Sequence, residues 1–297
     1  MSRKTNFIIF FVILISFATV IFFVYPRIKQ KPAATFSGDS AYQFVVDQMK
    51  YGPRTPGSLA HKQVEYYIIQ KLEDYGWQVE TQILTIEGHA VINIIGKRGN
   101  SGEITLIGAH YDSRMVASEE SSQILQSLPV PGANDGASGV AVLLELARTL
   151  PELPGRQIWL VFFDAEDQGH IPGWAWILGS KAYVQNMAIK PAKVVILDMI
   201  GDSDLTIYRE QGSDANLTDQ IWRSAAELGY SNTFIDKTKY SILDDHLPFI
   251  EAGIPAVDLI DFDYPWWHTT SDTADKVTPH SLEIVGKTII HWLESNP

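Results

Sequence analysis

Six short runs of apolar, largely β-branched residues recur along this chain of 297 residues. They do not alternate with polar residues, which is typical of strands buried on both faces of a sheet. The runs cover residues 78–86, 90–97, 104–109, 157–163, 193–199 and 255–260. We therefore predict a single α/β domain with a mixed, mostly parallel central sheet and helices on both faces.

Segments with helical spacing lie between these runs and beside them. In residues 58–75 the apolar positions form one stripe, and Gly76 is a suitable C-terminal stop. Thr278 and Pro279 are a typical N-cap and first-turn pair for the last helix. Helices are predicted over residues 40–50, 58–75, 137–150, 176–186, 214–228, 245–252 and 279–294.

The N-terminal part of the chain has a different composition. Residues 7–24 are apolar and uncharged over about the 20 residues that span a bilayer. The run is longer than a signal-peptide core and no clear cleavage motif follows it, so we expect a signal anchor, with a cleaved signal peptide as the alternative. The expected division is a cytoplasmic stub and transmembrane helix over 1–27, a linker over 28–38, and a domain outside the cytoplasm over 39–297.

Charge and cysteine content exclude several functions. The net charge of −12 argues against a nucleic-acid partner. The chain has no cysteine, so it contains no disulfide and no thiolate nucleophile. Any metal must therefore bind to histidine and carboxylate side chains.

Short acidic and histidine motifs stand where the predicted strands end. Because ligands bind at the carboxyl ends of strands in such sheets, we expect these motifs to surround one crevice. Each motif offers a carboxylate or an imidazole, which are ligands that Zn²⁺ takes. The motifs are GAHYDS (108–113), GANDGASG (132–139), FFDAED (162–167), ILDMIG (196–201), DDHLPF (244–249) and WWHTTSDT (266–273).

Taken one by one, the motifs have ordinary explanations. Asp135 can be a simple helix N-cap, Glu166 and Asp167 can belong to a solvated loop, and His268 can be a core residue. Adjacent carboxylates at a buried strand end, however, repel each other unless a cation or a proton lies between them. Asp198 ends the apolar run VVILDMI and needs a polar partner there. Together the motifs predict a metal site of carboxylate and histidine.

The ordered set of motifs resembles the zinc-dependent peptidases of the aminopeptidase type. Within that group it is most similar to the glutaminyl-peptide cyclotransferases, or glutaminyl cyclases, over about residues 45–295. The motif at 244–249 matches the cyclase pattern Asp-Asp-His-x-Pro-Phe, and the peptidases usually carry Ser at its first position. Trp267 directly precedes His268, as in cyclases. Asp167 departs from the pattern, which usually has Glu there.

The resemblance implies a zinc aminopeptidase-like fold, one zinc ion and a peptide substrate whose N-terminal glutamine is cyclised to pyroglutamate with release of ammonia. The implied zinc ligands are Asp135, Asp167 and His268, the implied catalytic groups are the general acid/base Glu166 with Asp198 and Asp244, and the implied pocket residues are Trp267, Trp174 or Trp176, and Tyr264. In the dimetal peptidases, the residues that match His110 and Asp198 hold a second zinc, so two ions stay an alternative here.

Two other functions stay open at this point. The first is an aminopeptidase with two zinc ions, in which Glu166 would activate a bridging water. The second is a membrane-anchored binding domain that has kept the fold and lost the metal. Counting the bound metal separates the three functions, because the cyclase implies one zinc per chain, the peptidase implies two, and the binding domain implies none.

Overall fold

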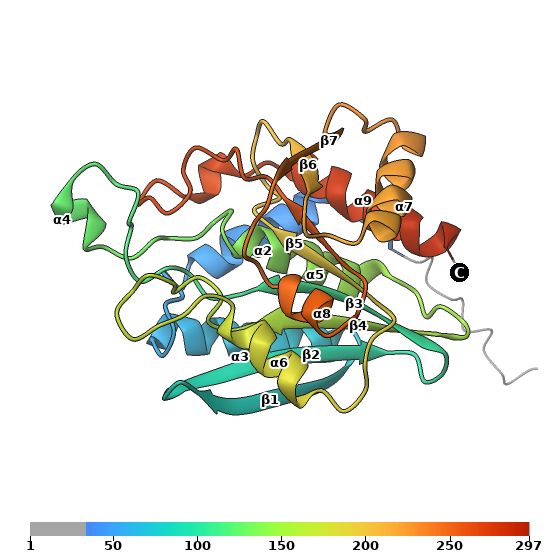
Figure 1. Cartoon of the computed structure of the whole chain (residues 1–297), viewed down its shortest axis with the longest axis horizontal. Helices are drawn as coiled ribbons and strands as arrows, with labels where there is room; N and C mark the ends of the chain where they lie inside the picture. Colours follow the sequence, from blue (N-terminus) through green and yellow to red (C-terminus); the bar gives the residue numbers. More distant parts are fainter. Residues whose placement is uncertain (1–33, 297) are drawn as a thin grey trace, which may run out of the picture. The chain divides into compact units, whose positions relative to one another are not determined.

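The computed structural model of the protein describes residues 34–296. Its central sheet has six strands in the order β1-β2-β4-β3-β5-β8 (Figure 1). All six predicted runs form this sheet, and their ends differ from the prediction by at most one residue. The strands are β1 (Gln78–Ile86), β2 (His89–Arg98), β3 (Glu103–His110), β4 (Arg156–Phe163), β5 (Lys193–Asp198) and β8 (Ala256–Ile260).

The strand directions explain why the motifs meet. Strand β3 pairs in parallel with both β4 and β5, and β5 pairs in parallel with β8. Only the pairings of β1 with β2 and of β2 with β4 are antiparallel. The carboxyl ends of β3, β4 and β5 therefore lie at the same edge of the sheet, and this edge carries His110, the segment after Phe163, and Asp198.

Helices cover both faces of the sheet, as the buried strand runs predicted. Alternate side chains of a strand point to opposite faces. In β4, for example, Leu160 and Phe162 pack in one hydrophobic cluster, while Val161 and Phe163 pack in the other. The first cluster includes residues of α2 (Gly38–Met49), α3 (Leu59–Asp74), α5 (Ala137–Thr149), α7 (Ala215–Glu227) and α9 (Pro279–Ser295), and the second includes residues of α6 (Leu178–Asn186) and α8 (Leu247–Glu251).

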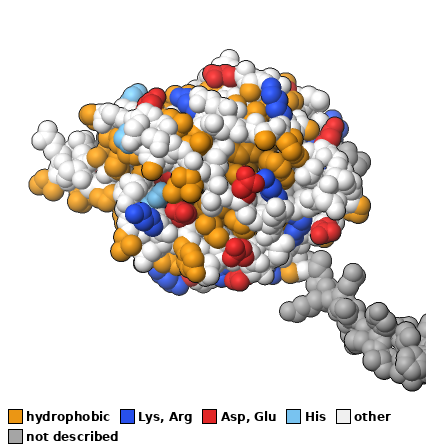
Figure 2. Space-filling model, turned by 90° about the horizontal axis from the view of Figure 1, so that it is seen from below, with side chains coloured by type: hydrophobic (Ala, Val, Ile, Leu, Met, Phe, Trp, Pro, Cys, Tyr) orange, Lys and Arg blue, Asp and Glu red, His pale blue; other side chains and the backbone are white. Residues whose placement is uncertain are grey.

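Four short elements were not predicted. Strands β6 (Ile207–Glu210) and β7 (Phe234–Tyr240) form a separate two-stranded sheet, and a 3₁₀ helix covers Ala274–Lys276. Helix α4 (Gln123–Gln126) protrudes from the body of the molecule (Figure 1). It buries none of its residues, and Figure 2 shows hydrophobic side chains on this protruding segment. The 3₁₀ helix, α4 and β6 have only three or four residues each, and β7 is largely polar and exposed, so none of them shows the apolar run or the periodicity on which the prediction depends.

The predicted signal anchor over residues 1–27 lies outside the described residues. Across residues 34–296, no helix combines the length and the apolar character that a membrane span requires. The compact unit begins at Thr35, and Phe36 is buried against Gly286 of α9.

Candidate active site

A cavity of about 250 Å³ opens at the carboxyl edge of the sheet. Acidic side chains line its floor and aromatic and aliphatic side chains line its walls. Five of the six motifs contribute to it, from segments that are more than 130 residues apart in the sequence, and this is the single crevice that the sequence predicted. The lining residues are Asp135, Glu166, Asp167, Trp176, Asp198, Met199, Tyr240, Ser241, Ile242, Leu243, Asp244, Ile260, Phe262, Trp267 and His268.

Asp135, Asp167 and His268 form a buried cluster in this floor, and each has a ligand atom within 4.8 Å of the others. The Nε2 atom of His268 lies 2.8 Å from Asp167 Oδ1 and 3.7 Å from Asp135 Oδ2. Within the described chain, Asp135 Oδ2 and Asp167 Oδ2 are buried and accept no hydrogen bond. Buried carboxylate oxygens without a donor are costly unless a cation satisfies them. Two carboxylates and one imidazole are a zinc-type ligand set, so these residues fit a zinc ion.

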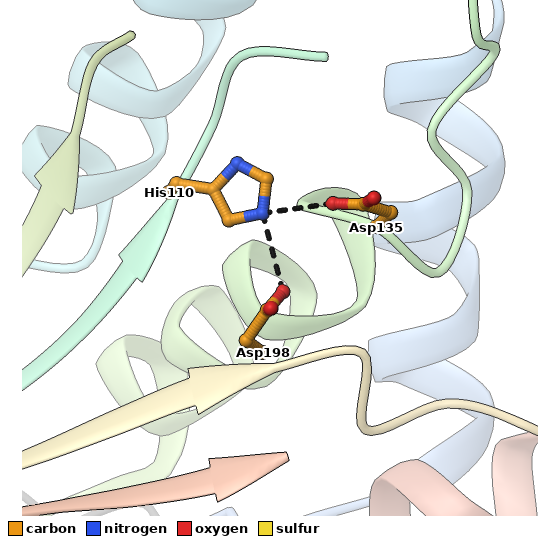
Figure 3. Close-up of side chains that lie close together, drawn as sticks. All are labelled: His110, Asp135 and Asp198. Atoms are coloured by element: carbon orange, nitrogen blue, oxygen red, sulfur yellow. Dashed lines mark hydrogen bonds and ion pairs between the residues drawn. The ribbon is translucent and has the colours of Figure 1, made fainter. Parts of the chain in front are cut away.

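A second buried cluster shares Asp135 with the first (Figure 3). His110 Nε2 lies 3.1 Å from Asp135 Oδ1 and 3.2 Å from Asp198 Oδ1. In Figure 3 the imidazole at the end of β3 points toward both carboxylates. The resemblance implied that a second zinc would bind to His110 and Asp198, and the structure brings these two residues together with Asp135.

Two further aspartates hold the loops that carry the predicted ligands. Asp112 accepts the backbone N–H groups of Glu166 (3.0 Å) and Asp167 (3.3 Å). Asp272 accepts the backbone N–H group of Asp135 (3.1 Å) and the hydroxyl of Tyr264 (2.7 Å). Carboxylates that bond to the segment around a metal ligand fix its orientation. Asp272 lies in the sixth motif, but sequence reasoning assigned it no role.

Glu166 and Asp198, two carboxyl groups of the cavity, have raised pKa values. Burial raises the pKa of Glu166 well above its usual range, and Asp167 and Asp244 add repulsion. Burial also raises the pKa of Asp198 to about 7, although its hydrogen bond with His110 acts in the opposite direction. A carboxyl group with a pKa nearer neutrality is suited to accept and return a proton.

The backbone has positive φ angles at three non-glycine residues of the site. Ala165 (φ 50°) precedes Glu166, Met199 (φ 46°) follows Asp198, and His268 itself has φ 54°. Such conformations cost about 1–3 kcal/mol each and persist where the surrounding structure imposes them. Ala165 and Met199 lie just after β4 and β5, and Glu166, Asp198 and His268 all line the cavity.

The predicted aromatic residues lie in different places. Trp267 and Trp176 line the cavity, and both rings stack on His268, with centroid distances of 3.7 and 5.9 Å. Trp174 stacks instead on His89 in the β1–β2 hairpin, at 3.6 Å. Tyr264 is buried beside the cavity and holds Asp272 rather than lining the wall.

Asp244 also belongs to a third buried group, which extends behind it and was not predicted as a unit. It consists of Asp244, His246 and Asp258, whose polar atoms come within 4.8 Å of one another. His246 Nε2 also lies 3.1 Å from Glu210 Oε2. Asp258 lies inside the apolar run of β8, and this is the same signal that identified Asp198. Glu210 belongs to β6 and carries no such signal.

Comparisons with known proteins agree with this geometry. The family model described as peptidase family M28 matches residues 93–293. Aminopeptidase YwaD from Bacillus subtilis is 30% identical over 214 residues, which are 65% of this chain but only 42% of that protein. The glutaminyl-peptide cyclotransferase of Drosophila melanogaster is 29% identical over 279 residues, which are 78% of this chain and 75% of that protein.

Solved structures show the same two groups of relatives. The glutaminyl cyclase of Porphyromonas gingivalis superimposes with a TM-score of 0.83 at 34% identity, over 88% of this chain and 99% of that chain. A Zn-dependent exopeptidase from Parabacteroides distasonis superimposes with a TM-score of 0.82 at 31% identity, over 87% of this chain and 98% of that chain. The fold is therefore shared by cyclases and exopeptidases, and the choice between them depends on the residues of the cavity.

Proposed function

The chain belongs to peptidase family M28, and we propose that it is a glutaminyl-peptide cyclotransferase that converts the N-terminal glutamine of peptides to pyroglutamate with release of ammonia. The observation that carries this proposal is the set of three carboxylates in the cavity beside the ligand cluster, namely Glu166, Asp198 and Asp244. Asp244 occupies the position at which the resembling peptidases usually have Ser.

In this proposal one zinc ion is held by Asp135, Asp167 and His268. When bound, it supplies a Lewis acid that polarises the carbonyl of the substrate's side-chain amide. The buried oxygens of Asp135 and Asp167 that accept no hydrogen bond support the assignment.

Glu166 acts as the general acid/base of the reaction. It accepts a proton from the substrate α-amine, whose nitrogen forms a bond to the side-chain carbonyl carbon as the ring closes. The bond from that carbon to the amide nitrogen then breaks, and Glu166 returns the proton to the leaving ammonia. Its raised pKa allows it to hold the proton between these two steps. No water molecule is consumed or released in this reaction.

The walls of the cavity fit a reaction that water would disturb. Trp176 and Trp267 lie beside His268, and Phe262 continues this wall, with its ring centroid 5.1 Å from that of Trp267. Ile242 forms part of the same lining. Aromatic and aliphatic walls exclude water from the reacting groups and position the small glutamine side chain.

An aminopeptidase with two zinc ions is the second candidate. The specific observation in its favour is the cluster of His110, Asp135 and Asp198, which adjoins the first cluster through Asp135. In that enzyme Glu166 would activate a water molecule. A bound zinc content of two per chain, together with release of an N-terminal amino acid, would support this candidate.

Ammonia release tests the proposed function. The protein is incubated with a peptide that begins with glutamine, and ammonia is measured over time. The Glu166→Gln variant, prepared in the same way, serves as the control for contaminating activities, because it keeps the shape of the site but cannot shuttle the proton. Ammonia released by the natural protein and not by the variant is expected; equal release from both would refute the assignment.

We also propose that residues 1–27 anchor the protein in a membrane, with the domain on the extracytoplasmic side. The apolar run over residues 7–24 supports this proposal. Cell fractionation tests it: the full chain should stay with membranes after washing at high salt and be released by detergent. Release by salt alone would contradict the anchor.

A further inference from the structure

Arg114 is a buried cation beside the ligand cluster. Its side chain comes from the segment that follows β3, in the alternating series His110, Asp112, Arg114. Arg114 is 3% exposed. A buried arginine needs a partner for each of its donors, so its contacts show what it holds in place.

The first contact of Arg114 is with the metal-ligand segment after β4. Its Nη1 atom donates to the carbonyl oxygen of Asp167 at 3.1 Å and to Asp167 Oδ1 at 3.4 Å, and its Nη2 atom donates to the carbonyl oxygen of Gly169 at 2.9 Å. The guanidinium therefore fixes both the backbone and the side chain of Asp167. Because aspartate is one methylene shorter than glutamate, its carboxylate reaches a common metal position only if its backbone is held close.

The second contact of Arg114 leads to the other side of the cluster. Its Nε atom donates to Ser118 Oγ at 3.1 Å, and the same oxygen lies 3.4 Å from His268 Nδ1. The Nε2 atom of His268 faces the two ligand carboxylates. A serine oxygen can accept two hydrogen bonds. Ser118 Oγ can therefore accept a hydrogen bond from the Nδ1–H group of His268, which leaves Nε2 free as a metal ligand.

The third contact of Arg114 is with the cavity wall. The guanidinium carbon lies 4.9 Å from the ring centroid of Trp176, and this ring stacks on His268 at an interplanar angle of 11°. Arg114 thus contacts the carboxylate of Asp167, the hydroxyl of Ser118, and the aromatic ring that stacks on the imidazole ligand.

From these contacts we infer that Arg114 and Ser118 are the positioning residues of the metal centre: Arg114 places the short Asp167 side chain, and Ser118 sets the tautomer and orientation of His268. The inference rests on the proposed zinc site, but not on which reaction the site performs. Its measurable consequence is the zinc affinity of the protein.

The experiment measures the zinc dissociation constant of the full chain by competition with a chromophoric chelator. Groups that orient metal ligands typically change the affinity by roughly 10–100-fold when they are removed. We expect Arg114→Gln and Ser118→Ala each to weaken zinc binding within this range. Ser118→Thr keeps the hydroxyl and should bind zinc within about threefold of the natural protein.

Two control variants separate positioning from general stability. Arg98 resembles Arg114 in its contacts, since it donates to the carbonyl oxygens of Leu150 and Tyr75 and lies 4.2 Å from the ring of Trp77, far from the cavity. Arg98→Gln should lower the melting temperature and leave zinc affinity unchanged. Ser127→Ala removes a hydroxyl that bonds only within its own exposed turn and should change neither quantity.

The melting temperature of the chelated, zinc-free protein is recorded for every variant, so that a loss of fold is recognised. Unchanged zinc affinity in folded Arg114→Gln and Ser118→Ala would overturn the inference while leaving the proposed function intact. Equal loss of affinity in Arg98→Gln would also overturn it, because the effect would then be a general consequence of lost stability. A natural protein that binds no zinc would overturn the zinc site itself and this inference with it.

Discussion

His246 is the best place to test whether the buried charges behind the cavity stabilise the fold. It is fully buried, with Nε2 3.1 Å from Glu210 Oε2 and Nδ1 3.8 Å from Asp258 Oδ2. Burial alone would raise the pKa of Glu210, but His246 and the backbone N–H groups of Gly212 and Ile242 lower it to about 2. We therefore expect His246→Gln to destabilise the protein at neutral pH.

The expected magnitude follows from this pKa. A reduction from 4.5 to about 2 corresponds to about 3.5 kcal/mol, at about 1.4 kcal/mol for each pH unit. The backbone donors supply part of it, so we assign about 2 kcal/mol to His246. In a domain of this size, this lowers the melting temperature by roughly 4–8 °C. Because the folded pKa of Glu210 is depressed, its contribution is present above its unfolded pKa of 4.5 and is lost as the pH falls toward about 2.

The assay is urea denaturation of the natural protein and the variant at pH 7 and pH 3. The destabilisation should be present at pH 7 and should shrink at pH 3. His291→Gln is the matched control, because His291 is paired with Glu227 at 2.8 Å but both side chains are partly exposed. Exposed pairs contribute at most about 1 kcal/mol. If His246→Gln loses no more stability than His291→Gln at pH 7, the reasoning is refuted.

Further variants test the assignments in the cavity and in the buried group behind it. Glu166→Gln should keep zinc and lose turnover by roughly a hundredfold or more; if it loses zinc while Asp167→Asn stays active, the two roles are reversed. His268→Ala should lose most of the zinc and the activity together, and full metal content with normal turnover would rule out its role. Asp244→Ser should strongly reduce ammonia release with zinc content and melting temperature nearly unchanged; undiminished release would contradict the proposed carboxylate network. Burial raises the pKa of Asp258 well above its usual range, so the folded protein retains a proton that the unfolded chain loses above about pH 4, and this group should lower the stability by about 1.4 kcal/mol per pH unit between that value and its raised folded pKa. Asp258→Asn should flatten this slope in denaturation experiments, and an unchanged slope would show that Asp258 is not the group that holds the proton.

The sheet and its helices could be predicted because their signals are local. An apolar run such as 193–199 indicates a buried strand wherever it stands, and Thr278 with Pro279 marks a helix start. Asp167 shares this property, because it closely follows the run 157–163, whereas Asp135 lies in the glycine-rich turn that opens α5 and His268 comes eight residues after β8. The strand ends then bring Asp135, Asp167 and His268 together, although more than 130 residues separate the first from the last.

The supporting residues could not be predicted because their partners are distant in the sequence and depend on side-chain direction. Arg114 and Asp167 are 53 positions apart, and Glu210 and His246 belong to a strand and a loop that no periodic pattern places side by side. The aromatic wall shows the same limit. Trp174 and Trp176 are two residues apart in an irregular segment, and only the structure shows that Trp176 faces the cavity while Trp174 stacks on the hairpin.

The most direct test of the central claim is a competition in one tube. Equal amounts of two peptides that differ only in their first residue, glutamine or leucine, are incubated with the zinc-loaded protein and followed by mass spectrometry. We expect the glutamine peptide to lose the mass of ammonia and keep all its residues, while the leucine peptide stays intact. Loss of the terminal leucine, with the glutamine peptide uncyclised, would contradict it and identify the protein as an aminopeptidase.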